Sequence, residues 1–523
     1  METDSAELVR LTLLENGAAP NLVQALIPSR PLDPGEQYRF HFDMTKCIGC
    51  RSCEVACNEQ NGNPADIRWR RVGELEGGTY PDTMRTYLSM GCNHCLSADC
   101  LRGCPVDAYT KDPLTGIVLH SAEACIGCQY CVWNCPYSVP QFNPERGVVG
   151  KCDMCRERLL DGREPACVNA CPENAIQIEI VNKEEWRADY SLAESPGMPA
   201  AGQTLSTTRI TLPKSSVSWL ERVDTGSIAL EHAHPSLVVM TTAMQAAFGL
   251  LCGLVVSRSL NAINLLLLLG ATVVALNVSV FHLGRPAYAW RAMKMWKRSW
   301  LSREVLCFTL FFLAVTGCTA SALSPVENLH LERFTTPLAY AALVAGAAGT
   351  LASACIYLVR ARPAWNMLHT PIDFFLSSLL LGVPLLSALS APATALMRHW
   401  SKVANHTTPL QFNAYPGIMG CLAILWISNQ IVRVIRLRRS EIFERRASYN
   451  HLRGDRLWWR VALAWLCALQ TPVFYFVSLP WLALISAIAA VLLNRYLFFV
   501  SVVPLNMGLT FIGSKGTHAR AAA

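Results

Sequence analysis

The stretch Cys47-Ile-Gly-Cys50-Arg-Ser-Cys53-Glu-Val-Ala-Cys57 decides the first half of the fold, because four cysteines follow one another at short, regular spacing. Three cysteines spaced by two residues can bind one face of a [4Fe–4S] cubane, whereas the fourth, three residues further on, points away towards another cluster. A quartet of this kind cannot complete its own cluster. The sequence must therefore supply a partner quartet.

Three further quartets follow the first. They are Cys92, Cys95, Cys100 and Cys104; Cys125, Cys128, Cys131 and Cys135; and Cys152, Cys155, Cys167 and Cys171. Proline follows the last cysteine of each of these three, whereas Asn58 follows Cys57. The quartets use sixteen of the 22 cysteines, which predicts four [4Fe–4S] clusters with four thiolates each.

Pairing the first quartet with the fourth, and the second with the third, lets each triplet take the last cysteine of its partner. The predicted sets are Cys47, Cys50, Cys53 and Cys171; Cys152, Cys155, Cys167 and Cys57; Cys92, Cys95, Cys100 and Cys135; and Cys125, Cys128, Cys131 and Cys104. Structural zinc is the first alternative, but it needs closed sets of four and has no use for a distant Cys-Pro. A disulfide framework is the second, and it is typical of short secreted chains.

The composition divides this chain of 523 residues into two domains. We expect an N-terminal extension at 1–37 without an export signal, and an α+β domain at 38–186 that resembles two bacterial ferredoxins, with strands near 38–42 and 175–180. The insert 58–91 should form a surface extension or face a partner. Ser, Pro, Gly and Thr are frequent at 187–235, which predicts a linker. An all-α membrane domain at 236–510 and a tail at 511–523 complete the chain.

Eight apolar windows predict an eight-helix transmembrane bundle. They lie at about 237–256, 263–281, 304–323, 338–358, 373–393, 414–432, 458–478 and 481–500. Most approach the roughly 20 residues that cross a bilayer, and they lack the amphipathic stripes of buried helices in a soluble protein. Only Ser478-Leu-Pro480 separates the last two windows, so we expect a very tight turn there.

Loop charges predict the orientation. With eight spans, the loops 282–303, 359–370 and 433–460 share the side of the cysteine domain and hold seventeen arginines and lysines, against four on the other side. Positive loops stay in the cytoplasm. We therefore expect a multi-pass protein of the bacterial cytoplasmic membrane, with its cysteine domain in the cytoplasm. Basic loops that dock an acidic partner are the alternative, and an odd number of spans would split the comparison.

His282 and Glu304 are the candidate quinone residues, because they fall at the cluster-side ends of neighbouring spans. A histidine and a carboxylate can exchange the protons that quinone chemistry requires; interfacial capping is the alternative. Asp373 is interpreted as a structural helix cap, and Arg495 as a partner for an acid. No haem is expected, because the histidines of the spans do not pair at suitable depths.

With these motifs in hand, the chain resembles two subunits of the dimethyl sulfoxide reductase family joined end to end. The motifs are Cys125-Ile-Gly-Cys128-Gln-Tyr-Cys131 and its companions, Phe281-His-Leu-Gly-Arg-Pro286, Ser299-Trp-Leu-Ser-Arg-Glu304 and Asn494-Arg-Tyr-Leu-Phe-Phe499. Residues about 38–185 resemble the electron-transfer subunit and about 236–510 the eight-span anchor. The resemblance implies a quinol site at His282 and Glu304, and a full [4Fe–4S] cluster with Cys100 as a ligand.

The resemblance also implies an electron conduit in anaerobic respiration. A separate molybdopterin catalytic subunit would exchange electrons with menaquinone or ubiquinone through the four clusters, and no nucleic acid is involved. The inward orientation resembles instead the branch of the family that oxidises sulfite and reduces quinone. Two other classes stay open: a charge-translocating redox module, and a zinc scaffold in the membrane.

Overall fold

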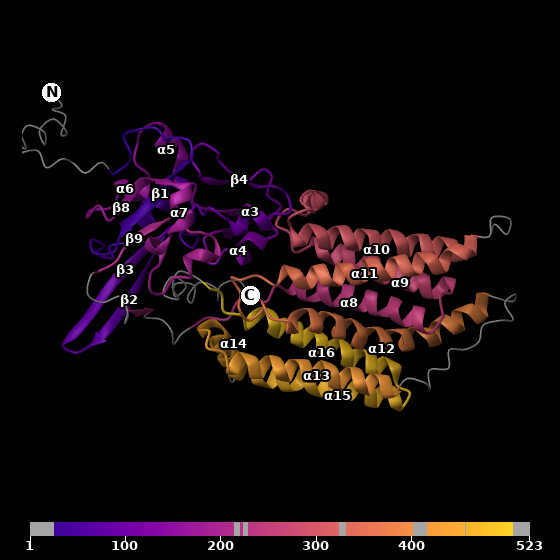
Figure 1. Ribbon diagram of the computed structural model, residues 1–523. Helices are drawn as coiled ribbons and strands as arrows, with labels where there is room; N and C mark the ends of the chain where they lie inside the picture. Colours follow the sequence, from indigo (N-terminus) through magenta and orange to yellow (C-terminus); the bar gives the residue numbers. More distant parts are fainter. Residues whose placement is uncertain are drawn as a thin grey trace, which may run out of the picture. The chain divides into compact units, whose positions relative to one another are not determined.

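The computed structural model describes residues 26–213, 220–222, 228–323, 331–400, 416–454 and 457–505. Two compact units make up the chain (Figure 1). Unit 1 comprises Met1–Ala98, Lys111–Leu119 and Cys152–Val223, and unit 2 comprises Asp99–Thr110, His120–Lys151 and Asp224–Ala523. The predicted extension up to residue 25 and the predicted tail 511–523 lie outside the described residues.

A three-stranded sheet forms the centre of unit 1. Strand β1 (Glu36–Asp43) pairs antiparallel with β8 (Ile176–Asn182) and parallel with β9 (Arg209–Thr211). Phe40 and Phe42 lie opposite Ile178 and Ile176, and these four side chains are buried, as the alternating pattern requires. The strands predicted before the first quartet and after the fourth are thereby confirmed. Their pairing brings the two quartets together.

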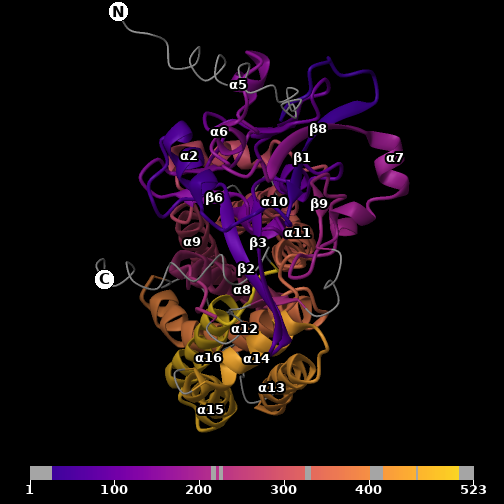
Figure 2. The ribbon, with the colours of Figure 1, turned by 90° about the vertical axis from the view of Figure 1, so that its left-hand side faces the viewer.

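The insert between the first two quartets forms a long hairpin. Helix α2 (Ser52–Asn61) precedes β2 (Arg71–Thr79) and β3 (Asp82–Met90), which pair along their whole length, and β10 (Glu221–Arg222) adds to the other edge of β2 (Figure 2). At the turn between the strands, the side chain of Tyr80 is 93% exposed. The tip of the insert is thus exposed, whereas Val72, Leu75 and Leu88 within it are buried; its interpretation as a surface or partner-facing extension stays a prediction.

Parts of the segment 187–235 that the structure describes are more ordered than the composition indicates. Trp186, in helix α7 (Lys183–Ala188), packs in a small core with Val181, Ala193 and Ala201, and its indole Nε1 donates to the carbonyl of Ser206 at 2.8 Å. Strand β9 also belongs to this segment. The interpretation as a linker is therefore incomplete, because one buried tryptophan and three strand residues anchor much of the segment to unit 1.

Short elements lie among the other cysteines. In unit 1 these are α5 (Arg156–Leu160) and α6 (Ala166–Asn169). In unit 2 they are α3 (Asp99–Gly103), α4 (Tyr130–Asn134), β6 (Gln141–Asn143) and β7 (Val148–Gly150). The chain passes between the units at β4 (Tyr109–Lys111) and β5 (Val118–His120). Part of the predicted cysteine domain, with six of the sixteen quartet cysteines, thus belongs to the same unit as the long helices.

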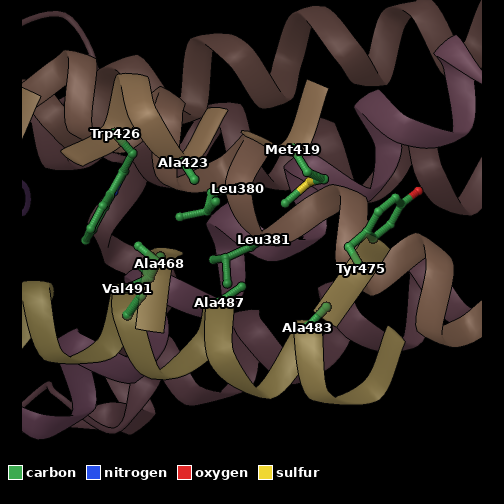
Figure 3. Packing of buried hydrophobic residues seen from close by; sticks show 11 residues of the cluster. Leu380, Leu381, Met419, Ala423, Trp426, Ala468, Tyr475, Ala483, Ala487 and Val491 are labelled. Atoms are coloured by element: carbon green, nitrogen blue, oxygen red, sulfur yellow. The ribbon is translucent and has the colours of Figure 1, made fainter. Parts of the chain in front are cut away.

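Among the described residues, eight long helices make up most of the rest of unit 2, with the shorter α14 (Phe443–Arg453) between two of them; Figure 1 shows their arrangement. They are α8 (Pro235–Val256), α9 (Ala262–Val280), α10 (Trp300–Leu323), α11 (Thr335–Ile356), α12 (His369–Trp400), α13 (Pro416–Arg438), α15 (Trp458–Phe476) and α16 (Pro480–Val500). Helices α8–α11 pack as one group of four, and α12, α13, α15 and α16 as another. Leu380, Leu381 and Trp426 lie in the core of the second group (Figure 3).

The two groups of helices meet where α8 crosses α12. A Cβ atom at Gly249 would lie 1.8 Å from the carbonyl oxygen of Ser378, and one at Gly382 would lie 2.2 Å from the backbone of Gly249. Glycine is therefore needed at both positions, because only backbone without side chains can approach this closely.

Seven helices among the described residues are long and apolar enough to cross a membrane. The predicted seventh span, 458–478, coincides with α15 but falls outside this set, since Arg460, Gln470 and Pro472 reduce its apolar character. The all-helical membrane domain is confirmed, whereas the count of eight spans stays a prediction. The expected tight turn between α15 and α16 contains Ser478 at φ +59°.

Candidate iron–sulfur and quinone sites

The Cys-x-x-Cys loops repeat one backbone conformation. In Cys47-Ile-Gly-Cys50 and Cys125-Ile-Gly-Cys128, the glycines have φ of +72° and +71°. The residues after the second cysteines, Arg51 and Gln129, have φ of +63° and +60°. Left-handed residues on both sides of the second cysteine curl the chain, and turns of this kind can point N–H groups at an anionic group. The same local structure therefore serves both quartets.

One predicted set surrounds a cavity in unit 1. The cavity encloses about 330 Å³, and Cys47, Cys50, Cys53 and Cys171 all line it. Apolar side chains such as Phe42, Val72 and Ile176 form much of the remaining wall. Cys171 comes from the fourth quartet, so the cavity joins a triplet to the last cysteine of its predicted partner.

A second cavity, in unit 2, repeats this arrangement. It encloses about 280 Å³, and its cysteines are Cys104, Cys125, Cys128 and Cys131. The other walls include Ile126, Tyr109 and His120, and the rings of the last two lie 4.7 Å apart between centroids. Here too the triplet of one quartet faces the last cysteine of another.

Of the remaining two predicted cysteine sets, the structure brings the members of one close together, whereas the other spans both units. In unit 1, the Cys57 thiol lies within electrostatic range of Cys155 and Cys167, and that of Cys152 within range of Cys57. This is the predicted set of 57, 152, 155 and 167. The set of Cys92, Cys95, Cys100 and Cys135 divides between the two units, and it stays a prediction.

The chemistry of these cysteines fits iron–sulfur clusters. Backbone N–H groups donate to sulfur at Cys104, Cys125, Cys152 and Cys171 over 3.3–3.4 Å, as around clusters, where such bonds tune the potential. Burial raises the pKa of the Cys57 and Cys128 thiols to about 12, so a bound metal is needed to hold them as thiolates. Among the described residues, no three His, Cys, Asp or Glu side chains converge on a single ion.

Within unit 2, the loop after α9 binds the third quartet through its backbone. The N–H groups of Gly284 and Arg285 donate to the carbonyls of Gly127 and Ile126 at 3.3 and 3.1 Å. A Cβ at Gly284 would lie 2.2 Å from the carbonyl oxygen of Gly147, and one at Gly127 2.8 Å from the Cα of Gly284. Three glycines thus allow the motif Phe281–Pro286 to touch a Cys-x-x-Cys loop.

The start of α10 binds the second quartet through side chains. Ser299 and Ser302 donate their hydroxyl hydrogens to the carbonyls of Gly103 and Pro105 at 2.7 and 3.3 Å. Arg298 forms an ion pair with Asp107. Gly103 and Pro105 flank Cys104, so the end of the helix bundle holds this cysteine directly.

His282 follows the end of α9, two residues before the Gly284 contact. Its Nδ1 atom is buried and has no hydrogen-bond partner among the described residues. Burial lowers the pKa of His282 to about 4, so the ring is neutral at neutral pH. The ring of His234, immediately before α8, lies within electrostatic range. The ring also interacts with the backbone of Ser279, and a neutral imidazole can bind a carbonyl or hydroxyl group.

Glu304 lies one turn into α10 and is 6% exposed. Its carboxyl group is close to the Ser353 hydroxyl of α11 and to the phenols of Tyr130 and Tyr357. No hydrogen bond or ion pair joins Glu304 to His282 in the described part of the chain. The two candidate residues therefore lie at the same end of the bundle without direct contact.

Asp373 and Arg495 form an ion pair, as expected for Arg495. Arg495 Nη2 lies 3.2 Å from Asp373 Oδ2, and Asn494 Nδ2 donates to Asp373 Oδ1 at 3.0 Å. Gln430 also donates to this carboxylate. The interpretation of Asp373 as a helix cap is wrong, because α12 begins at His369 and the carboxylate serves side chains of α13 and α16 instead.

Sequence reasoning missed an aromatic group beside the third quartet. The indole of Trp133, between Cys131 and Cys135, lies 5.4–5.9 Å from the rings of His234, Trp365 and Tyr357. These residues come from the ends of α8, α11 and α12. The tryptophan between two cysteines was the available signal, but its partners are far apart in the sequence.

Comparisons with known proteins agree with this geometry. A family described as "4Fe-4S dicluster domain" matches residues 83–180, and one described as "DMSO reductase anchor subunit (DmsC)" matches 255–500. An anaerobic dimethyl sulfoxide reductase chain of Haemophilus influenzae is 36% identical over 187 residues, which are 34% of this chain and 87% of the relative. A sulfite dehydrogenase subunit of Allochromatium vinosum is 32% identical over 182 residues, 31% of this chain and 76% of the relative.

The similarity to the Haemophilus reductase chain covers most of that relative, and the anchor match covers the long helices. Both halves of the predicted fusion are thus accounted for, and the protein carries iron–sulfur clusters and a multi-pass membrane anchor. The whole chain therefore belongs to the dimethyl sulfoxide reductase family, as a fusion of its iron–sulfur subunit with its membrane anchor subunit.

Proposed function

We propose that the chain relays electrons between a molybdopterin catalytic subunit and membrane quinone through four [4Fe–4S] clusters, held by the four predicted cysteine sets. The observation that carries the proposal is the direct contact, within unit 2, between the membrane helices and the loops around Cys104 and Cys125. The cavity lined by these cysteines is thereby fixed beside the helix ends. A cluster there would be the last before the membrane.

His282 and Glu304 are proposed to bind the quinone and exchange its protons. Quinone carries two electrons and two protons between membrane proteins. The neutral imidazole of His282 offers Nδ1 to a quinone oxygen, and the Glu304 carboxyl group can accept or return a proton beside Ser353 and Tyr130. The roles are complementary, because one group orients the ring and the other moves protons.

Variants at these two positions test the site. His282→Gln and Glu304→Gln should each reduce quinol-coupled turnover of the whole complex at least about 100-fold. Activity with an artificial dye that reacts with the clusters should remain. Cys307→Ser, one turn further along α10, is the matched control and should retain both activities. Quinol-coupled turnover that survives both changes would refute the site.

The direction of electron flow has two candidates. Relatives include an anaerobic dimethyl sulfoxide reductase chain and a sulfite dehydrogenase subunit. The basic loops favour a cytoplasmic cluster domain in the bacterial membrane, which suits sulfite oxidation with quinone as acceptor. The complex should contain molybdenum and about sixteen irons per chain. Rates of sulfite oxidation and sulfoxide reduction, measured on one preparation, decide between the two.

A further inference from the structure

Arg70 is a buried arginine of unit 1 that lies just before β2. It is 2% exposed, and its Nη1 donates to the carbonyl and the hydroxyl of Ser89, both at 3.3 Å. Its Nη2 has no hydrogen-bond partner among the described residues. The guanidinium lies over the ring of Phe40, 4.6 Å from the centroid, and Gly91 leaves room for Nη2. The side chain is thus held in one place.

Neighbouring arginines have carboxylate partners, whereas Arg70 has none in the described part of unit 1. Arg68 lies 3.1 Å from Glu54, and Arg51 lies 3.9 Å from Glu74. A buried charge without a partner is costly and requires opposite charge nearby. Glu54 and Glu74 thus already have arginine partners, and no ion pair joins Arg70 to a carboxylate among the described residues.

The cysteines of both clusters proposed for unit 1 provide this charge. Ser89 Oγ, which Arg70 contacts, lies 3.2 Å from Cys53 Sγ of the first set. Burial lowers the pKa of the Arg70 guanidinium, but thiolates raise it above its ordinary value, so it stays charged. These thiolates are Cys167, Cys53, Cys152 and Cys57. Arg70 therefore lies within electrostatic range of the thiolates of two cysteine sets.

We propose that Arg70 provides a fixed positive charge between the two iron–sulfur clusters of unit 1 and thereby raises the reduction potential of both. This rests on the proposed function, because it needs the clusters to be present. A cubane with four thiolates gains one negative charge on reduction, and a buried cation stabilises the more negative state. The same charge weakens the repulsion between the two clusters when both are reduced.

Redox titration of the purified complex, followed by low-temperature EPR, tests this role. In Arg70→Gln, the ratio of reduced to oxidised cluster at the wild-type midpoint potential should fall at least about tenfold for both clusters, equal to about 59 mV for a one-electron couple. The cluster of unit 2 should keep its potential. Arg70→Lys, which retains the charge, should stay close to wild type.

Arg85→Gln is the matched control, because Arg85 is exposed on β3 and pairs with Glu76; it should change no potential. Unchanged potentials in Arg70→Gln with full iron content would overturn the inference and leave the proposed function standing. Equal shifts in reduction potential in the Gln and Lys variants, or loss of iron from both, would also overturn the inference. Either result would mean that the shape of the arginine side chain matters, and not its charge. A wild-type complex without iron would overturn the proposed function, and this inference with it.

Discussion

His234 shows how burial of one side chain makes unit 2 sensitive to acid. Burial lowers the pKa of His234 to about 4; His232, His282 and Arg362 lower it further and Glu231 opposes them. The unfolded chain, with a histidine pKa near 6.5, therefore binds a proton at a pH where the folded chain does not. This contribution to stability is complete above about pH 6.5 and is lost as the pH falls towards about 4.

His234→Gln should remove part of this acid sensitivity, on the order of 1–3 kcal/mol. The measurement is the melting temperature of the detergent-purified complex at about pH 7 and about pH 5. The decrease between the two should be smaller in the variant than in wild type. His232→Gln, at the exposed neighbour, should stay closer to wild type. An identical decrease in wild type and His234→Gln would contradict the prediction.

At the residue scale, the spacing of the cysteines predicted which residues are cluster ligands. The Cys125, Cys128 and Cys131 triplet and its Cys104 partner follow from cluster geometry, and the structure places these four around one cavity. The close contact of Gly127 with Gly284 could not be predicted, because it joins segments more than a hundred residues apart. Motifs specify ligands, whereas the neighbours of a ligand come from the tertiary fold.

At the element scale, the α8–α12 crossing offers a direct test of close packing. Gly249→Ala places a Cβ atom 1.8 Å from a backbone oxygen of α12, so the helices must separate. We expect a loss of about 2–4 kcal/mol, seen as a lower melting temperature. Gly270→Ala, in α9, is the matched control, because nothing lies within 4 Å of its new methyl group. Equal melting temperatures for both variants would show that the crossing tolerates separation.

Helix α15 shows that apolar pattern alone does not decide whether a helix spans a membrane. Its apolar pattern predicted a span, and its 19 residues would extend about 28 Å at 1.5 Å per residue. Ala468 and Tyr475 pack in one core with Ala483 and Ala487 of α16, so tertiary packing stabilises a helix of lower hydropathy. Similarly, the segment 187–235 has the composition of a linker, but Trp186 anchors part of it. Long-range burial overrides local composition in both cases.

At the scale of the whole molecule, the fold places the proposed quinone residues and the cluster nearest the membrane at one end of the helix bundle. His282 follows α9, Glu304 begins α10, and the loops between them bind the segments around Cys104 and Cys125. Electrons and quinone protons would then be exchanged on the same side. No charge needs to cross the bilayer, which argues against the charge-translocating alternative.

Turnover of the complex in proteoliposomes tests whether the reaction moves charge across the bilayer. In proteoliposomes that contain the whole complex, we supply either a quinol with a sulfoxide as oxidant or quinone with sulfite as reductant. We expect turnover with no change in a potential-sensitive dye, because electrons and protons enter or leave the quinone at the same face. An ionophore that dissipates a potential should leave the rate unchanged, whereas in a charge-translocating enzyme it would raise the rate. A quinol oxidase of known electrogenic action in the same vesicles is the control for dye response and vesicle tightness. A potential that develops during turnover, and collapses with the ionophore, would place the proton exchange on the opposite side from His282 and Glu304.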